Sequence, residues 1–111
     1  MLTTVIKLDE FLRQAKGVMT DADRAELVDY LAANPDAGIS LGGGLRKLRF
    51  ARQGAGKSGG FRSIHFYRPA VGPVILLALF AKNEKANLTA SELAGLLKLG
   101  DILAAHYGKR T

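Results

Sequence analysis

The amino-acid sequence predicts an α+β fold in which a small, largely antiparallel sheet packs against two N-terminal helices and one C-terminal helix. Apolar residues recur at helical spacing near both ends of the chain. The segments between them alternate in polarity or run apolar, as strands do. With 111 residues, 48% of them hydrophobic, the chain is expected to form a single domain over residues 1–111.

The N-terminal third is predicted to hold a short strand followed by two helices. β-Branched residues at positions 3–6 favour the strand. Apolar residues between positions 8 and 15 recur at helical spacing and predict the first helix. Thr20 is a suitable N-cap for the second helix, which should end at Asn34, because Pro35 disfavours helical backbone in the residue before it.

The middle of the chain is predicted to supply three more strands. Three consecutive glycines at 42–44 are expected to lead flexibly into a strand over 45–51, in which apolar and basic residues alternate. A glycine-rich mobile loop at 52–60 should connect it to an alternating strand over 61–68. The strand over 74–80 is apolar at every position, which predicts a central strand covered on both faces.

The C-terminal segment is predicted to be a helix. Thr89 and Glu92 have the spacing of a capping box, and leucines follow at helical spacing before Gly108. Gly95 and Gly100 fall inside this helix, where each costs about 1 kcal/mol relative to alanine. These two glycines leave open whether the helix is continuous.

Positive charge is concentrated in the predicted strands and the segments that join them. Nine of the sixteen basic residues lie between positions 42 and 89, against one acid, whereas the first 36 residues hold seven acids and four bases. The nine are Arg46, Lys47, Arg49, Arg52, Lys57, Arg62, Arg68, Lys82 and Lys85. Clustered cations are typical of a surface for a polyanion, because they release condensed counterions from phosphates. The alternative is a solvated face with extended side chains.

The same residues would converge on one groove if three predicted strands are neighbours. Lys47 and Arg49 share one side of the strand over 45–51. Further cations lie on the next strand or follow the last one, namely Arg62, Arg68, Lys82 and Lys85. The sequence therefore predicts an RNA-binding groove.

Composition and spacing disfavour several other classes of protein. The absence of cysteine excludes disulfides, thiolate metal sites and a cysteine nucleophile. Two distant histidines and a single acid among the basic strands offer no metal-ligand cluster, so no metal and no other cofactor are expected. No secretory signal is recognisable, and the apolar run at 71–81 is about half the roughly 20 residues that a membrane span requires. A cytoplasmic protein without membrane contact is expected.

Residues 51–58 (A-R-Q-G-A-G-K-S) are close to the phosphate-binding loop G-x-x-x-x-G-K-[ST]. Such a loop requires a helix whose N-terminus faces the phosphate. The residues at 61–68 predict a strand instead. Nucleotide hydrolysis is therefore disfavoured.

Candidates for acid–base chemistry are few. A metal-free ribonuclease needs a base for the 2′-hydroxyl, cations for the transition-state charge and a proton donor for the leaving 5′-oxygen. His65 suits the first or last role because imidazole titrates near neutral pH, although a lone histidine in a strand is more often a packing residue. Tyr67 has same-face spacing from His65, and a lysine among other cations also loses proton affinity.

Four segments between positions 34 and 88 carry a family resemblance. They read N-P-D-A-G at 34–38, G-G-L-R-K-L-R at 43–49, G-K-S-G-G-F-R-S-I at 56–64 and F-A-K-N-E-K-A-N-L at 80–88. In this order and register they resemble the RelE/HigB toxins of type II toxin–antitoxin modules, and the HigB-like branch in particular. The helical flanks fit the same RelE-like fold.

The resemblance implies a toxin that cuts messenger RNA in the decoding site of the ribosome, through attack of the 2′-hydroxyl and without a metal. It also implies a cognate antitoxin as partner, expected to be a helix-turn-helix protein. Lys57 and Arg62 match basic positions that the family uses around the scissile phosphate. Lys82 and Lys85 match the basic pair after the last strand.

Two departures from RelE leave the general base undecided. Asn83 stands where RelE has an arginine, and Leu88-Thr89 occupies the region of its catalytic tyrosine. The predicted catalytic residues are therefore Arg62, Lys82 and Lys85, with Tyr67, His65 or a lysine as base, and the predicted RNA-binding residues are Lys47, Arg49, Lys57 and Arg68. Two other functions stay open: a non-catalytic RNA- or ribosome-binding module of the same fold, and a ParE-like inhibitor of DNA gyrase.

Overall fold

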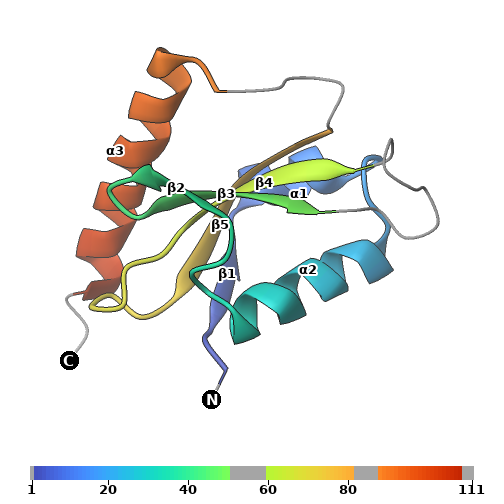
Figure 1. Ribbon diagram of the computed structural model, residues 1–111, viewed down its shortest axis with the longest axis horizontal. Coiled ribbons are helices and arrows are strands. Elements are labelled where there is room, and N and C mark those ends of the chain that lie inside the picture. The colour runs from blue at the N-terminus through green and yellow to red at the C-terminus, as the bar shows by residue number, and fades with distance from the viewer. Residues whose placement is uncertain (1, 51–59, 82–87, 109–111) are drawn as a thin grey trace.

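The computed structural model describes residues 2–50, 60–81 and 88–108 (Figure 1). In this part of the chain, three helices and five strands follow one another. Their bounds are β1 Val5–Lys7, α1 Asp9–Ala15, α2 Asp21–Ala33, β2 Ile39–Gly42, β3 Leu45–Phe50, β4 Phe61–Phe66, β5 Val74–Ala81 and α3 Ala90–Gly108. The predicted α+β fold is confirmed. None of these helices combines the length and hydropathy needed to cross a membrane.

The strands of the described chain form one sheet in the order β1-β5-β4-β3-β2. β1 runs parallel to β5, and the remaining pairs are antiparallel. β3, β4 and β5 are adjacent, which is the condition under which the basic residues were expected to converge. β5 has a strand on each side over its first half, where its side chains are buried, as predicted for a central strand.

The structure contains one strand that the sequence pattern did not predict. β2 pairs antiparallel with β3, and Gly43 and Gly44 form the turn between them, directly after Gly42 at the end of β2. These glycines have φ angles of +94°, +63° and +101°, a backbone conformation that favours glycine. The glycines therefore connect two paired strands, where the sequence led us to expect only an entry into one strand. β2 escaped prediction because it is a short edge strand with mostly exposed side chains, so it lacks an alternating apolar pattern.

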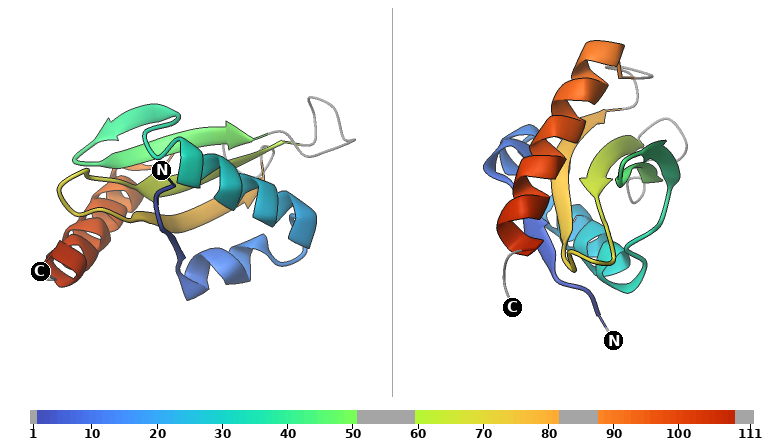
Figure 2. Two further views of the ribbon diagram at one scale, coloured as in Figure 1. Left: turned by 90° about the horizontal axis from the view of Figure 1, so that it is seen from below. Right: turned by 90° about the vertical axis from the view of Figure 1, so that its left-hand side faces the viewer.

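The two faces of the sheet bury separate apolar cores. One face packs against α1 and α2 through Phe11, Leu27 and Leu31. The other face packs against α3, where Ile64 and Phe66 of β4 are fully buried. Figure 2 shows α2 and α3 on opposite sides of the sheet. A side chain of the sheet is therefore covered either by α1 and α2 or by α3, depending on the face to which it points.

Capping boxes fix where α2 and α3 begin. The Thr20 hydroxyl accepts a hydrogen bond from the Asp23 amide at 3.0 Å, and the Asp23 carboxylate accepts one from the Thr20 amide. Thr89 and Glu92 make the same reciprocal pair before α3, at 3.1 and 2.9 Å. These bonds satisfy amide groups that a helix start leaves without partners. Both predicted N-caps are confirmed.

α3 is continuous through both of its internal glycines. Gly100 is buried, and a Cβ atom at this position would collide with the ring of Phe66. A Cβ atom on Gly95 would meet nothing within 4 Å. Gly100 is therefore required for close packing of the helix on the sheet, whereas Gly95 is not.

The pairing of β4 with β5 contains an irregularity, because β5 has one extra residue there. Ile64 pairs with Ala78 and His65 pairs with Leu76, so Leu77 is the extra residue of a β-bulge. Leu77 and Ala78 both pack with the core beneath α3. The bulge thus adds one apolar side chain to the face that α3 partly covers.

Candidate nucleic-acid interface

Two arginines lie directly opposite each other on the sheet face that packs against α3. Arg49 of β3 pairs with Arg62 of β4, and Arg62 in turn pairs with Phe80 of β5. Directly paired residues of antiparallel strands point to the same face, with Cβ atoms about 5 Å apart. The three side chains therefore form one row across three strands, which we call the cation–aromatic row. Arg49 is exposed, and Arg62 and Phe80 are partly exposed.

Lys47 extends this arrangement by one pair of residues along the strands. It lies on β3 opposite Ile64, which is paired with Ala78 of β5. Lys47 therefore points to the same face as Arg49 and Arg62, and it is partly exposed. We call the surface formed by Lys47, Arg49 and Arg62 the basic face. Three of the predicted site residues are thus brought together.

Arg68 is not brought to the basic face. It follows the other end of β4, where Nη2 donates to the Gly43 carbonyl at 2.7 Å and to the Asp101 carboxylate at 2.5 Å. Nε donates to the same Gly43 carbonyl, and the guanidinium lies 4.7 Å from the centre of the Phe66 ring. Arg68 thus joins the β2–β3 turn to α3.

His65 lies on the opposite face of the sheet from Arg62. It pairs with Leu76 in the core under α1 and α2, and its side chain has 0% exposed area. The Nε2 atom lies 3.0 Å from the carbonyl oxygen of Pro35, which can only accept, so Nε2–H is the donor. Burial lowers the pKa of His65 to about 4, partly offset by the Pro35 hydrogen bond, and the nearby Arg46 lowers it further. His65 is therefore neutral at pH 7 and out of reach of the basic face.

Tyr67 also turns away from the basic face. Its ring packs against the core under α1 and α2, and its amide donates to the Gly44 carbonyl at 2.9 Å. Tyr67 and His65 were predicted to share a face of the sheet, and this packing is consistent with that prediction. The two non-lysine candidates for the general base therefore lie apart from Arg62.

Three predicted site residues, Lys57, Lys82 and Lys85, lie outside the described residues, as does nearly all of the predicted loop at 52–60. The residues that border these segments are in register. Phe61 pairs with Phe50 on one side and with Ala81 on the other. These border residues are the immediate neighbours of the cation–aromatic row along the three strands.

Comparison with known families decides the class of protein. The sequence-family model for the RelE toxin of the RelE/RelB toxin–antitoxin system matches residues 3–110 of this chain. The chain belongs to the RelE toxin family. It is a RelE-type toxin of a toxin–antitoxin system, which implies a cognate antitoxin as partner. Membership of the HigB-like branch stays a prediction.

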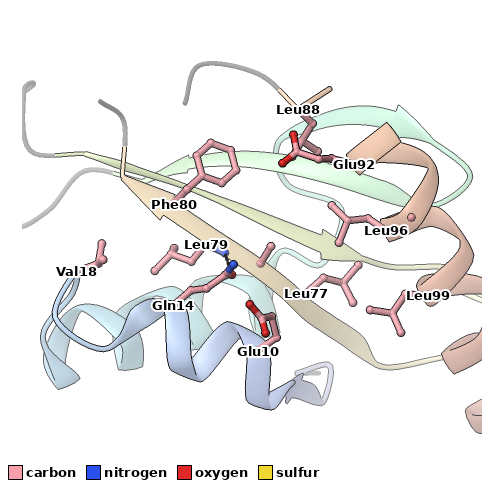
Figure 3. A pocket seen from close by; sticks show the side chains of 12 residues that line it. Glu10, Gln14, Val18, Leu77, Leu79, Phe80, Leu88, Glu92, Leu96 and Leu99 are labelled. Carbon is pink, nitrogen blue, oxygen red and sulfur yellow. Dashed lines mark hydrogen bonds between the residues drawn. The ribbon is translucent and has the colours of Figure 1, made fainter. Parts of the chain in front are cut away.

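This RelE-type toxin has a cavity of about 610 Å³ along the outer edge of β5, which the sequence did not predict (Figure 3). Residues of α1, β5 and α3 line it, including Glu10, Gln14, Leu77, Phe80, Leu96 and Leu99. β1 pairs with β5 only as far as Leu76, so the edge of β5 beyond the bulge faces the cavity. There, the Gln14 side-chain oxygen accepts a hydrogen bond from the Leu79 amide at 2.9 Å. The cavity exists because β1 is shorter than β5. The local sequence pattern of either strand does not predict where their pairing ends.

In residues 2–50, 60–81 and 88–108 of this RelE-type toxin, no three His, Cys, Asp or Glu side chains gather as ligands for a metal ion. The chemical groups of the described interface are instead guanidinium and ammonium groups beside an aromatic ring. Such groups are suited to phosphate binding, charge stabilisation and base stacking.

Proposed function

We propose that this toxin is a ribosome-dependent endoribonuclease that cuts messenger RNA without a metal ion. In the proposed reaction, a base removes the proton of a 2′-hydroxyl, and the 2′-oxygen attacks the adjacent phosphorus. The bond to the 5′-oxygen breaks, and that oxygen takes up a proton. The products are a 2′,3′-cyclic phosphate and a 5′-hydroxyl end.

The observation that carries this proposal is the direct pairing of Arg49 with Arg62. Two guanidinium groups at such a pair bring positive charge together at one point of the sheet, where a phosphate can accept hydrogen bonds from both. Lys47 on the same face adds a third cation. Together with membership of the RelE toxin family, this arrangement supports RNA as the ligand.

The roles we propose for the residues follow from their chemistry. Arg62, Lys82 and Lys85 would stabilise the charge of the pentacovalent phosphorane, and Arg49, Lys47 and Lys57 would bind flanking phosphates. We propose a lysine as the base. The burial of His65 and the packing of Tyr67 on the other face support this choice over both.

Primer extension on ribosome-bound messenger RNA tests the activity. Arg62→Gln should lower the cleavage rate by about 10²–10³, the usual effect of losing one group that stabilises transition-state charge. Arg24→Gln on α2 is the matched control and should cleave as the parent does. Analysis of the product ends tests the chemistry. Ends with 3′-hydroxyl and 5′-phosphate groups would refute 2′-hydroxyl attack.

Two conservative variants test the choice of base. His65→Gln and Tyr67→Phe should both retain cleavage if a lysine is the base, provided that circular dichroism shows them folded. Loss of cleavage in folded Tyr67→Phe would return the role to that residue. A toxin that binds ribosomes normally but never cleaves would instead favour the non-catalytic RNA-binding module.

The antitoxin is proposed to be a small helix-turn-helix protein encoded beside the toxin. Co-expression should abolish the toxicity of the parent protein, and the two should purify as one complex. Arg62→Gln should still form that complex if its effect is confined to chemistry. A neighbouring product that neither binds nor neutralises the toxin would contradict this part of the proposal.

A further inference from the structure

Phe80 ends the cation–aromatic row and also lines the cavity beside β5. Its direct partner on β4 is Arg62, whose partner on β3 is Arg49. We propose that the ring of Phe80 is a stacking platform for one unpaired nucleobase of the bound RNA, whose phosphate lies at Arg49 and Arg62. This inference rests on the proposed function, since it names how the same site holds its RNA.

The spacing of the row suits one nucleotide. Neighbouring strands are about 4.8 Å apart, so Arg49 and Phe80, which are two strands apart, are separated by roughly 10 Å. Phosphate and base lie at opposite ends of a nucleotide, and the row offers cations at one end and an aromatic ring at the other. Aromatic side chains beside a basic groove are the usual means by which proteins hold single-stranded RNA.

The cavity supplies space beside the ring. Figure 3 shows the Phe80 side chain on the α3 side of β5, beside the cavity, with Leu88 and Leu96 farther along the same side. Phe80 is partly exposed although it packs on the core beneath α3. The lining is mostly apolar, with Glu10, Gln14 and Glu92 as its polar members, and its apolar part favours the flat faces of a base over a hydrated phosphate. A base that leaves the RNA stack next to Arg62 therefore has a largely apolar surface to occupy.

A purely structural role for Phe80 is the competing explanation, and its substitution alone cannot distinguish the two. The test therefore changes both the ring and the base. Ribosomes are programmed with a messenger that is 2′-O-methylated in the decoding site, so that binding is measured without cleavage. Each decoding-site base is removed in turn by an abasic substitution. The affinity of the full-length toxin is measured for each messenger.

With the parent toxin, one abasic position should weaken binding roughly 5- to 150-fold, the range for one stacked base. Phe80→Leu should lose this dependence and bind the intact and abasic messengers equally. Phe80→Tyr should behave as the parent does, because it keeps the ring. Tyr30→Leu removes a ring of 44% exposure on α2 and should also behave as the parent does.

An abasic penalty that is as large in Phe80→Leu as in the parent would overturn the inference. It would also be overturned if the parent bound every abasic messenger as tightly as the intact one. In both cases the parent still binds programmed ribosomes, so the proposed function stands. Failure of the proposed function is a different result, in which the parent neither binds programmed ribosomes nor cleaves unmodified messenger, and then both proposals fall.

Discussion

Arg49 and Arg62 occupy directly opposed positions on β3 and β4, so two guanidinium groups share one point on the surface of the sheet. The pair is thus expected to raise the attraction of this point on the sheet for a polyanion. Replacing one arginine tests this.

The first prediction is that Arg49→Gln weakens the binding of the toxin to ribosomes. The slope of log affinity against log salt should fall by about one unit, because one phosphate contact is lost. A salt titration of ribosome binding measures both the affinity and this slope. Unchanged affinity and salt dependence would place the phosphate elsewhere.

The second prediction concerns the pH dependence of stability. The pKa of His65 is about 4 in the folded protein, against 6.5 for a histidine in its ordinary, solvated state. Between these pH values the unfolded chain binds more protons than the folded one. The contribution of His65 to the free energy of unfolding should therefore be largest above pH 6.5 and should fall as the pH is lowered toward 4. The slope that His65 contributes should approach about 1.4 kcal/mol per pH unit in this window.

Urea denaturation at a series of pH values, with the parent and His65→Gln compared, checks this. The difference in unfolding free energy between the two proteins should change across that window and level off above it. A difference that is the same at pH 4.5 and pH 7.5 would contradict a histidine that is buried in the neutral form.

The third prediction uses the two glycines of α3 as a matched pair. Gly95→Ala should raise stability by up to about 1 kcal/mol, because alanine is the better helix former and its Cβ meets no neighbour. Gly100→Ala should lower stability by roughly 1–3 kcal/mol, because its Cβ would displace the Phe66 ring. Thermal unfolding followed by circular dichroism measures both. Stabilisation by both substitutions would mean that α3 does not pack closely against the Phe66 ring at Gly100.

The fourth prediction is that Arg68 acts mainly on stability. Its guanidinium joins the Gly43 carbonyl to Asp101, and both partners of the ion pair are partly exposed. Arg68→Gln should therefore lower the free energy of unfolding by roughly 1 kcal/mol. It should change ribosome affinity less than Arg49→Gln does. The opposite ranking, with stability unchanged, would support the RNA-binding role that the sequence suggested.

The part of the interface that the sequence predicted is the part that strand alternation determines. Lys47 and Arg49 are two residues apart on β3, so they share a face in any regular strand. The antiparallel neighbour brings Arg62 beside them. Strand pattern alone therefore located the basic face, even though β2 was missed.

The parts that were not predicted depend on contacts between distant segments. β4 was expected to extend to Arg68, but its strand ends at Phe66, and the Arg68 side chain bonds to Gly43 and Asp101. Both partners lie at least 25 residues away along the chain, in a turn and a helix. Burial of His65 likewise depends on α1 and α2 covering one face of the sheet. No local spacing carries this information.

The hydrogen bond from the Leu79 amide to Gln14 has a consequence for behaviour in concentrated solution. Beyond Leu76, the described part of β1 no longer covers β5, and this edge is rich in apolar side chains. Open apolar edges of this kind are where sheets of two molecules pair and begin to aggregate. Gln14 occupies one backbone donor of that edge with a side chain that cannot extend the sheet. A single uncharged side chain on α1 is therefore expected to oppose self-association when the toxin is overproduced.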